Sequence, residues 1–147
     1  MKITFGSDHG GFKLKSALVK FARDLGYEVV DIGTFSNKSV DYPDFAKKVA
    51  KEVADDDTDA GVLVCRTGIG MSISANKVTG ARAALCYSQK VAELSRLHND
   101  ANILCLGADF IELEEAKRIF SKWVNTRFEG GRHKIRVGKI EELERLI

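Results

Sequence analysis

Proline is almost missing from this sequence, with one residue in 147, and the chain has no low-complexity segment and no internal repeat. We therefore expect a well-ordered globular protein that folds as one domain over residues 1–147. No apolar run approaches the ~20 residues that a membrane-spanning helix needs, so no membrane partner is expected. Residues Met1–Phe5 enter an expected strand at once and leave no room for a signal peptide, which predicts a cytoplasmic protein.

Excess charge and paired cysteines are missing as well. The formal net charge of +2 argues against a protein built to bind nucleic acid. The cysteines are Cys65, Cys86 and Cys105, and no two of them have the C-x-x-C spacing of a zinc knuckle or a redox pair. A disulfide framework is not expected, because Cys86 and Cys105 lie in apolar runs typical of strands. The sequence also shows no clear set of metal ligands.

What the sequence does contain is a regular alternation of short apolar runs and amphipathic segments. The apolar runs predict buried strands, and the segments between them carry apolar residues at helical spacing. This alternation predicts an α/β protein, a Rossmann-like three-layer α/β/α sandwich around a five-stranded parallel sheet. The expected strands are residues 2–6, 27–32, 62–64, 80–86 and 101–106, the expected helices 12–25, 42–54, 71–78, 89–97, 111–126 and 137–147, and the main polar loops 33–41, 98–100 and 128–136.

One stretch, Gly61–Lys77, combines a strand with a glycine-containing turn and the start of a helix. In a parallel sheet this turn lies at the carboxyl end of the strand, where backbone N–H groups point outward and the helix dipole favours an anion. Cys65 is at the rim of the turn, and a helix N-terminus can lower the pKa of a thiol from ~8.5 toward neutrality. The residue fits a catalytic base or nucleophile, and it also fits a small buried residue that ends a strand.

Two further polar pairs fall near expected strand ends. Asp8 and His9 follow the first strand, and His98 and Asn99 come close to the fifth. Because ligands bind beyond the carboxyl ends of parallel strands, we expect both pairs at the same edge as Cys65. Asp8 and His9 would orient a hydroxyl and bind phosphate, and His98 would act as an acid. The simpler interpretations are a helix cap at Asp8 and a surface loop histidine at His98.

A basic pair completes the candidate site. Arg132 and Arg136 are four residues apart, and they fit a phosphate clamp as well as a solvated basic loop. An anion cradle, a thiol, an imidazole and a basic pair together fit a small phosphorylated substrate. Two other classes fit poorly. A cysteine phosphatase needs arginine six residues after its nucleophile, where this chain has Met71, and the dinucleotide fingerprint lacks its third glycine, replaced by Ile73.

Five motifs, taken in their order and spacing, point to one family. They are Gly6–Gly11, Asp41–Asp44, Cys65–Ile73, Ser95–Ile103 and Phe128–His133. Over nearly its whole length the chain resembles the ribose-5-phosphate isomerase B family, the cysteine-dependent branch of a group that also contains allose- and galactose-6-phosphate isomerases. The resemblance implies interconversion of D-ribose 5-phosphate and D-ribulose 5-phosphate without metal or cofactor. It also implies a homodimer or a tetramer, with active sites between subunits and the final helix packed on the partner.

The same resemblance assigns roles to individual residues. Cys65 matches the base that removes the C2 proton of the open-chain sugar, with Thr67 beside it. His98 matches the donor that helps open the furanose ring, assisted by Asp8. The other matching positions are substrate contacts: the backbone of Arg66, Thr67, Gly68, Ile69 and Gly70 as an anion hole for the enediolate, His9, Arg132 and Arg136 at the phosphate, and Tyr42 and Asn99 elsewhere on the substrate.

The chain departs from the family pattern at Arg66, where the pattern has glycine. If this position needs a positive φ, arginine costs roughly 1–2 kcal/mol of strain. Its side chain is expected to narrow the pocket, reach the phosphate or lower the pKa of the Cys65 thiol. Two alternatives to a ribose 5-phosphate isomerase stay open for this reason. One is an isomerase of a 6-phosphohexose such as allose 6-phosphate, and the other is a non-catalytic sugar-phosphate-binding protein.

Overall fold

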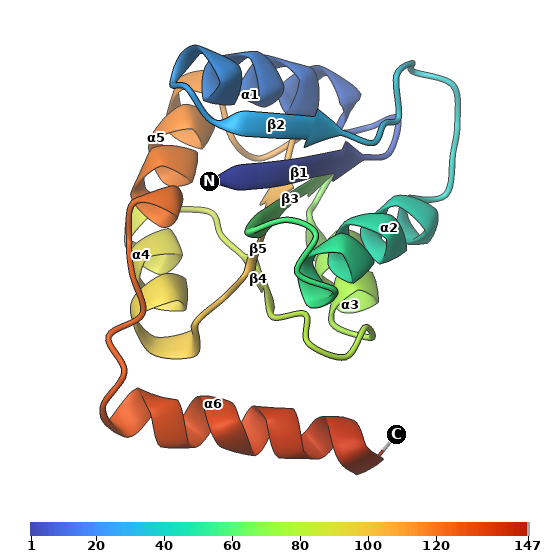
Figure 1. The fold of residues 1–147 in the computed structure, drawn as a ribbon. Coiled ribbons are helices and arrows are strands. Elements are labelled where there is room, and N and C mark those ends of the chain that lie inside the picture. Colours follow the sequence, from blue (N-terminus) through green and yellow to red (C-terminus); the bar gives the residue numbers. More distant parts are fainter. Residues whose placement is uncertain (147) are drawn as a thin grey trace.

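Five parallel strands form the centre of the molecule in the computed structural model, which describes residues 1–146 (Figure 1). The strands are β1 (Lys2–Ser7), β2 (Glu28–Asp31), β3 (Ala60–Cys65), β4 (Ala83–Leu85) and β5 (Ile103–Gly107). Their order across the sheet is β2-β1-β3-β5-β4, and all neighbours are parallel. β3 is therefore central, and the strand order switches direction between β1 and β3. This switch point is where α/β sheets bind ligands.

Helices cover both faces of the sheet. They are α1 (Phe12–Asp24), α2 (Tyr42–Ala54), α3 (Ile69–Ala75), α4 (Gln89–Asn99), α5 (Leu113–Val124) and α6 (Arg132–Leu143), followed by a 3-10 turn at Glu144–Leu146. Because side chains alternate along a strand, Val62 and Val64 of β3 pack with α1, α4 and α5, whereas Leu63 and Cys65 pack with α2 and α3. This three-layer arrangement confirms the predicted fold class. Among residues 1–146, no helix is long and apolar enough to cross a lipid bilayer.

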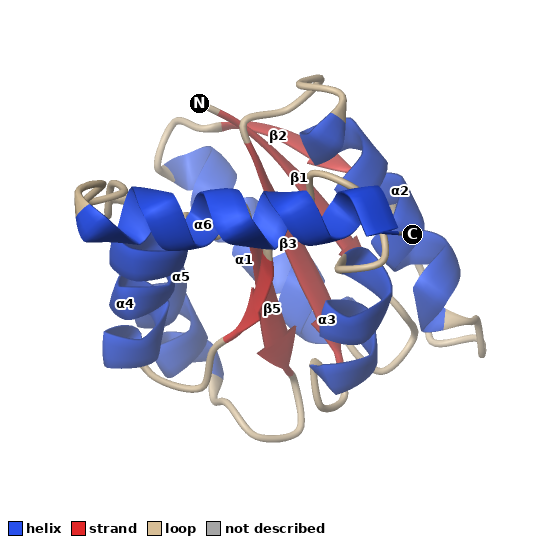
Figure 2. Cartoon of the chain, turned by 90° about the horizontal axis from the view of Figure 1, so that it is seen from below, coloured by secondary structure: helices blue, strands red, loops and turns tan. Residues whose placement is uncertain are grey.

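The last helix, α6, belongs to neither layer. It extends across the β4 edge of the sheet, from the end of α4 toward α3 (Figures 1 and 2). Arg82, just before β4, lies 3.6 Å from the carboxylate of Glu141, and the N–H of Gly80 donates to Glu144 at 2.8 Å. The predicted helix over 137–147 is thus present but starts earlier, and Ile147 lies outside the described residues.

Several predicted boundaries differ from the structure, and three of the differences have a clear local reason. α4 continues through His98 and Asn99, because the residue that turns the chain is Asp100, which has a φ of 47°. α6 starts at Arg132 rather than after a loop, since the two positive-φ glycines of 130–131 already turn the chain. β4 covers three residues, because the chain is still turning at Gly80, which has a φ of 87°.

A buried ion pair fixes the loop that follows β2. The Lys15 side chain is fully buried, and its ammonium group donates to both carboxylate oxygens of Asp31, at 2.8 and 2.9 Å, and to the carbonyl of Thr34 at 2.8 Å. The ring of Phe35 lies over the same ammonium, 4.8 Å from its centroid. Loop 33–41, which starts here, ends beside His9. The ion pair therefore holds a segment that contacts the candidate site.

Removing one partner of this pair is expected to destabilise the protein strongly. Asp31→Ala leaves the Lys15 charge buried without a counterion, and we expect a loss of about 3 kcal/mol in the free energy of unfolding. The matched control is Asp24→Ala, which breaks the exposed pair between Lys20 and Asp24 and should cost less than about 1 kcal/mol. Urea denaturation measures both values. Equal losses in the two variants would contradict a special role for the buried pair.

Candidate active site

A cleft of about 450 Å³ opens at the carboxyl ends of β1 and β3, at the switch point of the sheet. The cleft contains the predicted site residues that follow β1 and β3, together with Tyr42, the first residue of α2. Its lining consists of Asp8, His9, Tyr42, Cys65, Arg66, Thr67, Ile69, Gly70 and Ile73. The structure thus places one half of the predicted site in a single cleft.

Cys65 is the last residue of β3, and its thiol is buried beneath the turn that follows. The N–H of Gly68 donates to Sγ at 3.1 Å, an interaction that stabilises negative charge on the sulfur. Gly68 has a φ of 76°, and a Cβ there would lie 2.9 Å from the carbonyl carbon of Leu106. Only glycine therefore lets the chain turn this closely over the thiol.

The turn also supplies free backbone donors. The N–H of Gly68 is used by the thiol, and that of Ile69 by the hydroxyl of Thr67 at 3.2 Å. Among residues 1–146, no acceptor faces the N–H groups of Arg66, Thr67 and Gly70. These three groups are the ones that can receive an anionic oxygen. Of the five backbone N–H groups expected to form an anion hole, those of Gly68 and Ile69 are therefore already used in hydrogen bonds within the turn.

Tyr42 covers this turn from the side of α2. A Cβ on Gly70 would come within 2.6 Å of the Tyr42 ring, so a larger residue at position 70 would push the ring away. The ring is partly exposed and lines the cleft. The placement of Tyr42 suits the substrate contact expected for it.

Asp8 and His9 occupy the turn after β1. One oxygen of the buried Asp8 carboxylate accepts from the N–H of Gly11 at 3.0 Å, just before α1, so this residue does stabilise the helix start. The Nδ1 atom of His9 accepts from the N–H of Val40 at 3.2 Å. A neutral His9 ring then carries its proton on Nε2, where it can donate to a phosphate oxygen.

Arg66 forms part of the cleft lining and has an unstrained backbone. Arg66 does not have a positive φ: in the described part of the chain, the non-glycine residues with a positive φ are Asp56 and Asp100. The aliphatic part of the side chain lies over Gly10, where a Cβ would be 2.5 Å from Cγ of Arg66. The guanidinium reaches Asp109 at 3.7 Å, and both groups are exposed. The condition under which arginine would be strained here is therefore not met, and a narrower cleft entrance stays a prediction.

The other half of the predicted site lies elsewhere. His98 and Asn99 end α4 and precede β5, so they lie at the amino edge of the sheet, opposite Cys65. The expectation that they share its edge is wrong for one chain, because residues before a strand lie at its amino end. Arg132 and Arg136 start α6, close to the end of α4 (Figure 1). None of these four residues lines the cleft around Cys65.

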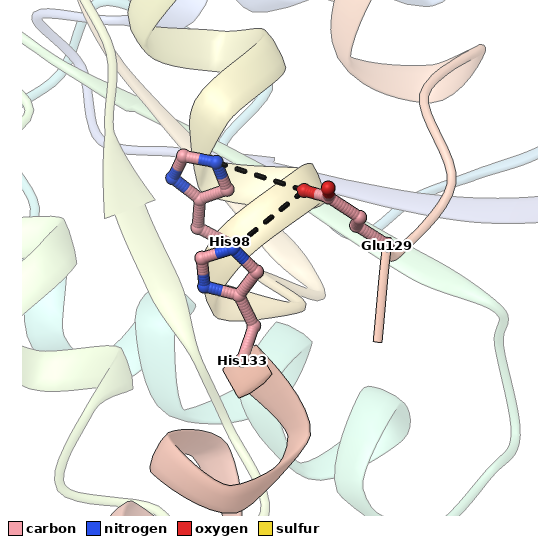
Figure 3. A group of neighbouring side chains, drawn as sticks. All are labelled: His98, Glu129 and His133. Carbon is pink, nitrogen blue, oxygen red and sulfur yellow. Dashed lines mark ion pairs between the residues drawn. The ribbon is translucent and has the colours of Figure 1, made fainter. Parts of the chain in front are cut away.

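Two functional candidates escaped the sequence analysis. His98 is surrounded by Glu129 and His133, which belong to a quoted motif but received no role (Figure 3). Their ligand atoms all lie within 4.8 Å of one another. The two imidazole rings are nearly parallel, with an interplanar angle of 12°, so their nitrogen lone pairs do not converge on one point. The geometry therefore suits hydrogen bonding and proton transfer better than a shared metal ion.

Comparisons with known proteins identify the family of this chain. The sequence profile of the family described as Ribose/Galactose Isomerase matches residues 3–140. Ribose-5-phosphate isomerase B of Escherichia coli is 47% identical over 143 residues, which are 97% of this chain and 96% of that enzyme. The structure of ribose-5-phosphate isomerase B from Clostridium thermocellum has a TM-score of 0.98 and 52% identity, and the match covers 99% of both chains.

A third relative is known with a sugar phosphate. The structure of ribose-5-phosphate isomerase B from Mycoplasma genitalium, with bound ribulose-5-phosphate, has a TM-score of 0.94 and 40% identity. The match covers 99% of this chain and 97% of that one. The fold, the thiol at the switch point and these relatives together lead to one conclusion: the chain belongs to the ribose/galactose isomerase family and is an isomerase of the ribose-5-phosphate isomerase B type.

Proposed function

We propose that this enzyme interconverts D-ribose 5-phosphate and D-ribulose 5-phosphate through an enediolate, the reaction of the non-oxidative pentose phosphate pathway. One observation carries the proposal. The Cys65 thiol accepts the Gly68 N–H beneath a turn that leaves three backbone N–H groups free. A base and an anion hole are thereby combined in one short segment, which is what aldose–ketose isomerisation requires.

The first step opens the sugar ring. His98 gives its proton to the ring oxygen as the bond from that oxygen to C1 breaks. The C1 hydroxyl loses its proton at the same time, and we assign the uptake of this proton to the Asp8 carboxylate, which lines the cleft. The product is the open-chain aldehyde. His9, Arg132 and Arg136 hold the phosphate, and this remote binding energy keeps the flexible open chain in place.

The second step moves a proton between neighbouring carbons. The Cys65 thiolate takes the C2 proton, and the electron pair moves onto the aldehyde oxygen O1. The free N–H groups of the turn stabilise this negative charge, each such donor contributing roughly 3 kcal/mol in comparable sites. The proton of the O2 hydroxyl then passes to O1. C1 takes the proton back from the thiol, which leaves a carbonyl at C2 and restores the thiolate.

We further propose that the enzyme acts as a homodimer. The two halves of the site lie at opposite edges of one sheet, so His98 can reach the sugar over Cys65 only if it comes from a second chain. Apolar side chains beside both halves are exposed and would be covered in such a dimer. They include Ile73 at the cleft and, on α6 and the turn after it, Ile135, Ile140, Leu143 and Leu146.

A comparison of sugars tests the substrate. We expect kcat/KM for ribose 5-phosphate to exceed that for allose 6-phosphate by at least about tenfold, because one extra carbon is worth 10–200-fold in a closed pocket and Arg66 narrows the entrance. Arg66→Gly should keep ribose 5-phosphate turnover and reduce this preference. Arg118→Ala, a remote exposed arginine on α5, is the control. A higher kcat/KM of the wild-type enzyme for allose 6-phosphate would show that ribose 5-phosphate is not its preferred substrate.

The non-catalytic alternative has its own measurement. A binding protein would take up ribose 5-phosphate without exchanging the C2 proton in heavy water. The proposed enzyme must exchange this proton or transfer it to C1, because both fates pass through the Cys65 thiol. Nuclear magnetic resonance of the sugar follows both. Tight binding with neither fate would refute an isomerase.

A further inference from the structure

The cluster around His98 joins two helices. His98 is in the last turn of α4, His133 is in the first turn of α6, and Glu129 is in the segment that leads into α6 (Figure 3). The N–H of Glu129 donates to the carbonyl of Leu97 at 3.1 Å, which ties this segment to the residue next to His98. The cluster is therefore held by backbone contacts as well as by its side chains.

The two imidazoles differ in their surroundings. Their rings stack with centroids 4.2 Å apart, and the His133 side chain is 7% exposed while that of His98 is 38% exposed. His98 is thus the ring that can meet a ligand, and His133 forms the wall behind it. Stacking on a buried ring removes rotational freedom from His98, so the direction of its nitrogen atoms is set before the substrate arrives.

A single carboxylate faces both rings. Oε2 of Glu129 lies 3.8 Å from Nε2 of His98 and 3.6 Å from Nε2 of His133. Burial lowers the pKa of His133, and the charges of His98, Arg132 and Arg136 lower it further, against the opposing effect of Glu129. The lowered pKa disfavours a proton on His133. The Glu129 carboxylate and the stacked His133 ring therefore face His98 from two sides, an arrangement that favours positive charge on the more exposed imidazole.

We propose that His133 and Glu129 are positioning residues for the acid of ring opening, with His133 fixing the plane of the His98 ring and the Glu129 carboxylate orienting that ring through its Nε2 atom. This inference rests on the proposed function, because it needs His98 to be the ring-opening acid. A further consequence is that two separate sets of residues support the two steps. The set on α4 and α6 supports ring opening, and the set around Cys65 supports proton transfer at carbon.

Two reactions separate these sets. Isomerisation of ribose 5-phosphate needs ring opening, because this sugar is mainly a furanose. Exchange of a C1 proton of ribulose 5-phosphate with heavy water needs only the Cys65 step, since this ketose is already open. Glu129→Gln removes the charge and keeps the shape, and His133→Phe keeps the stacked ring and removes its nitrogen atoms. Glu114→Gln, an exposed glutamate on α5, is the matched control.

We expect Glu129→Gln to lower kcat for ribose 5-phosphate by roughly tenfold, a part of the 10²–10⁴-fold that a general acid supplies. The alkaline limb of its pH–rate profile should move to lower pH, since a cationic acid that loses its carboxylate partner gives up its proton more readily. C1 exchange should stay within about twofold of wild type in Glu129→Gln and in His133→Phe. His133→Phe should keep the stacking part of the effect and so retain more isomerisation than His133→Ala.

Three results would overturn the inference. Isomerisation and C1 exchange that fall in parallel would show a structural effect on the whole site. Full isomerisation in Glu129→Gln would show that the carboxylate has no part in the reaction. A wild-type protein that neither isomerises nor exchanges would refute the proposed function first, and the inference with it.

Discussion

Cys65→Ala is expected to lower kcat for ribose 5-phosphate by roughly 10²–10⁴-fold, the usual contribution of a general base. The thiol accepts the N–H of Gly68, in the same turn that carries the free N–H groups. Alanine removes the base and leaves these donors and the phosphate contacts in place. Substrate binding, measured by calorimetry, should therefore change much less than turnover. The circular dichroism spectrum should stay that of the wild type, because the side chain is small.

The other two cysteines are the controls. Burial raises the pKa of Cys86 to about 11, against a weaker effect of its hydrogen bond with Ser95, and burial also raises the pKa of Cys105 well above its usual value. Both thiols stay protonated at neutral pH and cannot act as bases. Cys86→Ala and Cys105→Ala should retain turnover within a few-fold. An equal loss in Cys86→Ala would mean that the base has been assigned to the wrong thiol.

The half of the site around Cys65 was predictable because it is local. Its strand, turn and helix are consecutive in sequence, and only glycine fits the positive φ at position 68. Asp8 and His9 follow the neighbouring strand, so the topology of a parallel sheet brings them to the same edge. Here local sequence and strand order determine the geometry together. At Arg66 the backbone has no positive φ, so the strain that this conformation would bring to an arginine does not arise.

The half around His98 was not predictable in the same way. A polar residue between a helix and a strand belongs to the amino edge of the sheet, and the sequence does not mark clearly where α4 ends. Contacts between α4 and α6 join residues far apart in sequence, as in the stacking of His98 on His133, which are 35 positions apart. No spacing rule describes such a contact. The buried pair of Lys15 and Asp31 is likewise a contact between distant residues, and lysines on an amphipathic helix ordinarily face solvent, so the sequence did not indicate it.

Mixing two inactive variants is expected to restore activity if the site is shared between chains. In a two-fold dimer, each site takes Cys65 from one subunit and His98 from the other. Cys65→Ala and His98→Gln homodimers each carry the same defect in both sites. In the mixed dimer, one site collects both defects and the other has neither. Random exchange makes about half of the dimers mixed, so activity should rise to about a quarter of the wild-type value.

The matched control uses two variants from the same half of the site. Cys65→Ala mixed with Asp8→Asn should restore nothing, because Asp8 and Cys65 line one cleft of one chain and every site keeps one of the two defects. Joint refolding from urea followed by an activity assay measures both mixtures, and differently tagged subunits allow the mixed dimer to be purified. Recovery with Asp8→Asn but not with His98→Gln would place His98 in the same chain as the base. No recovery in either mixture, with mixed dimers present, would exclude a site built from these two chains.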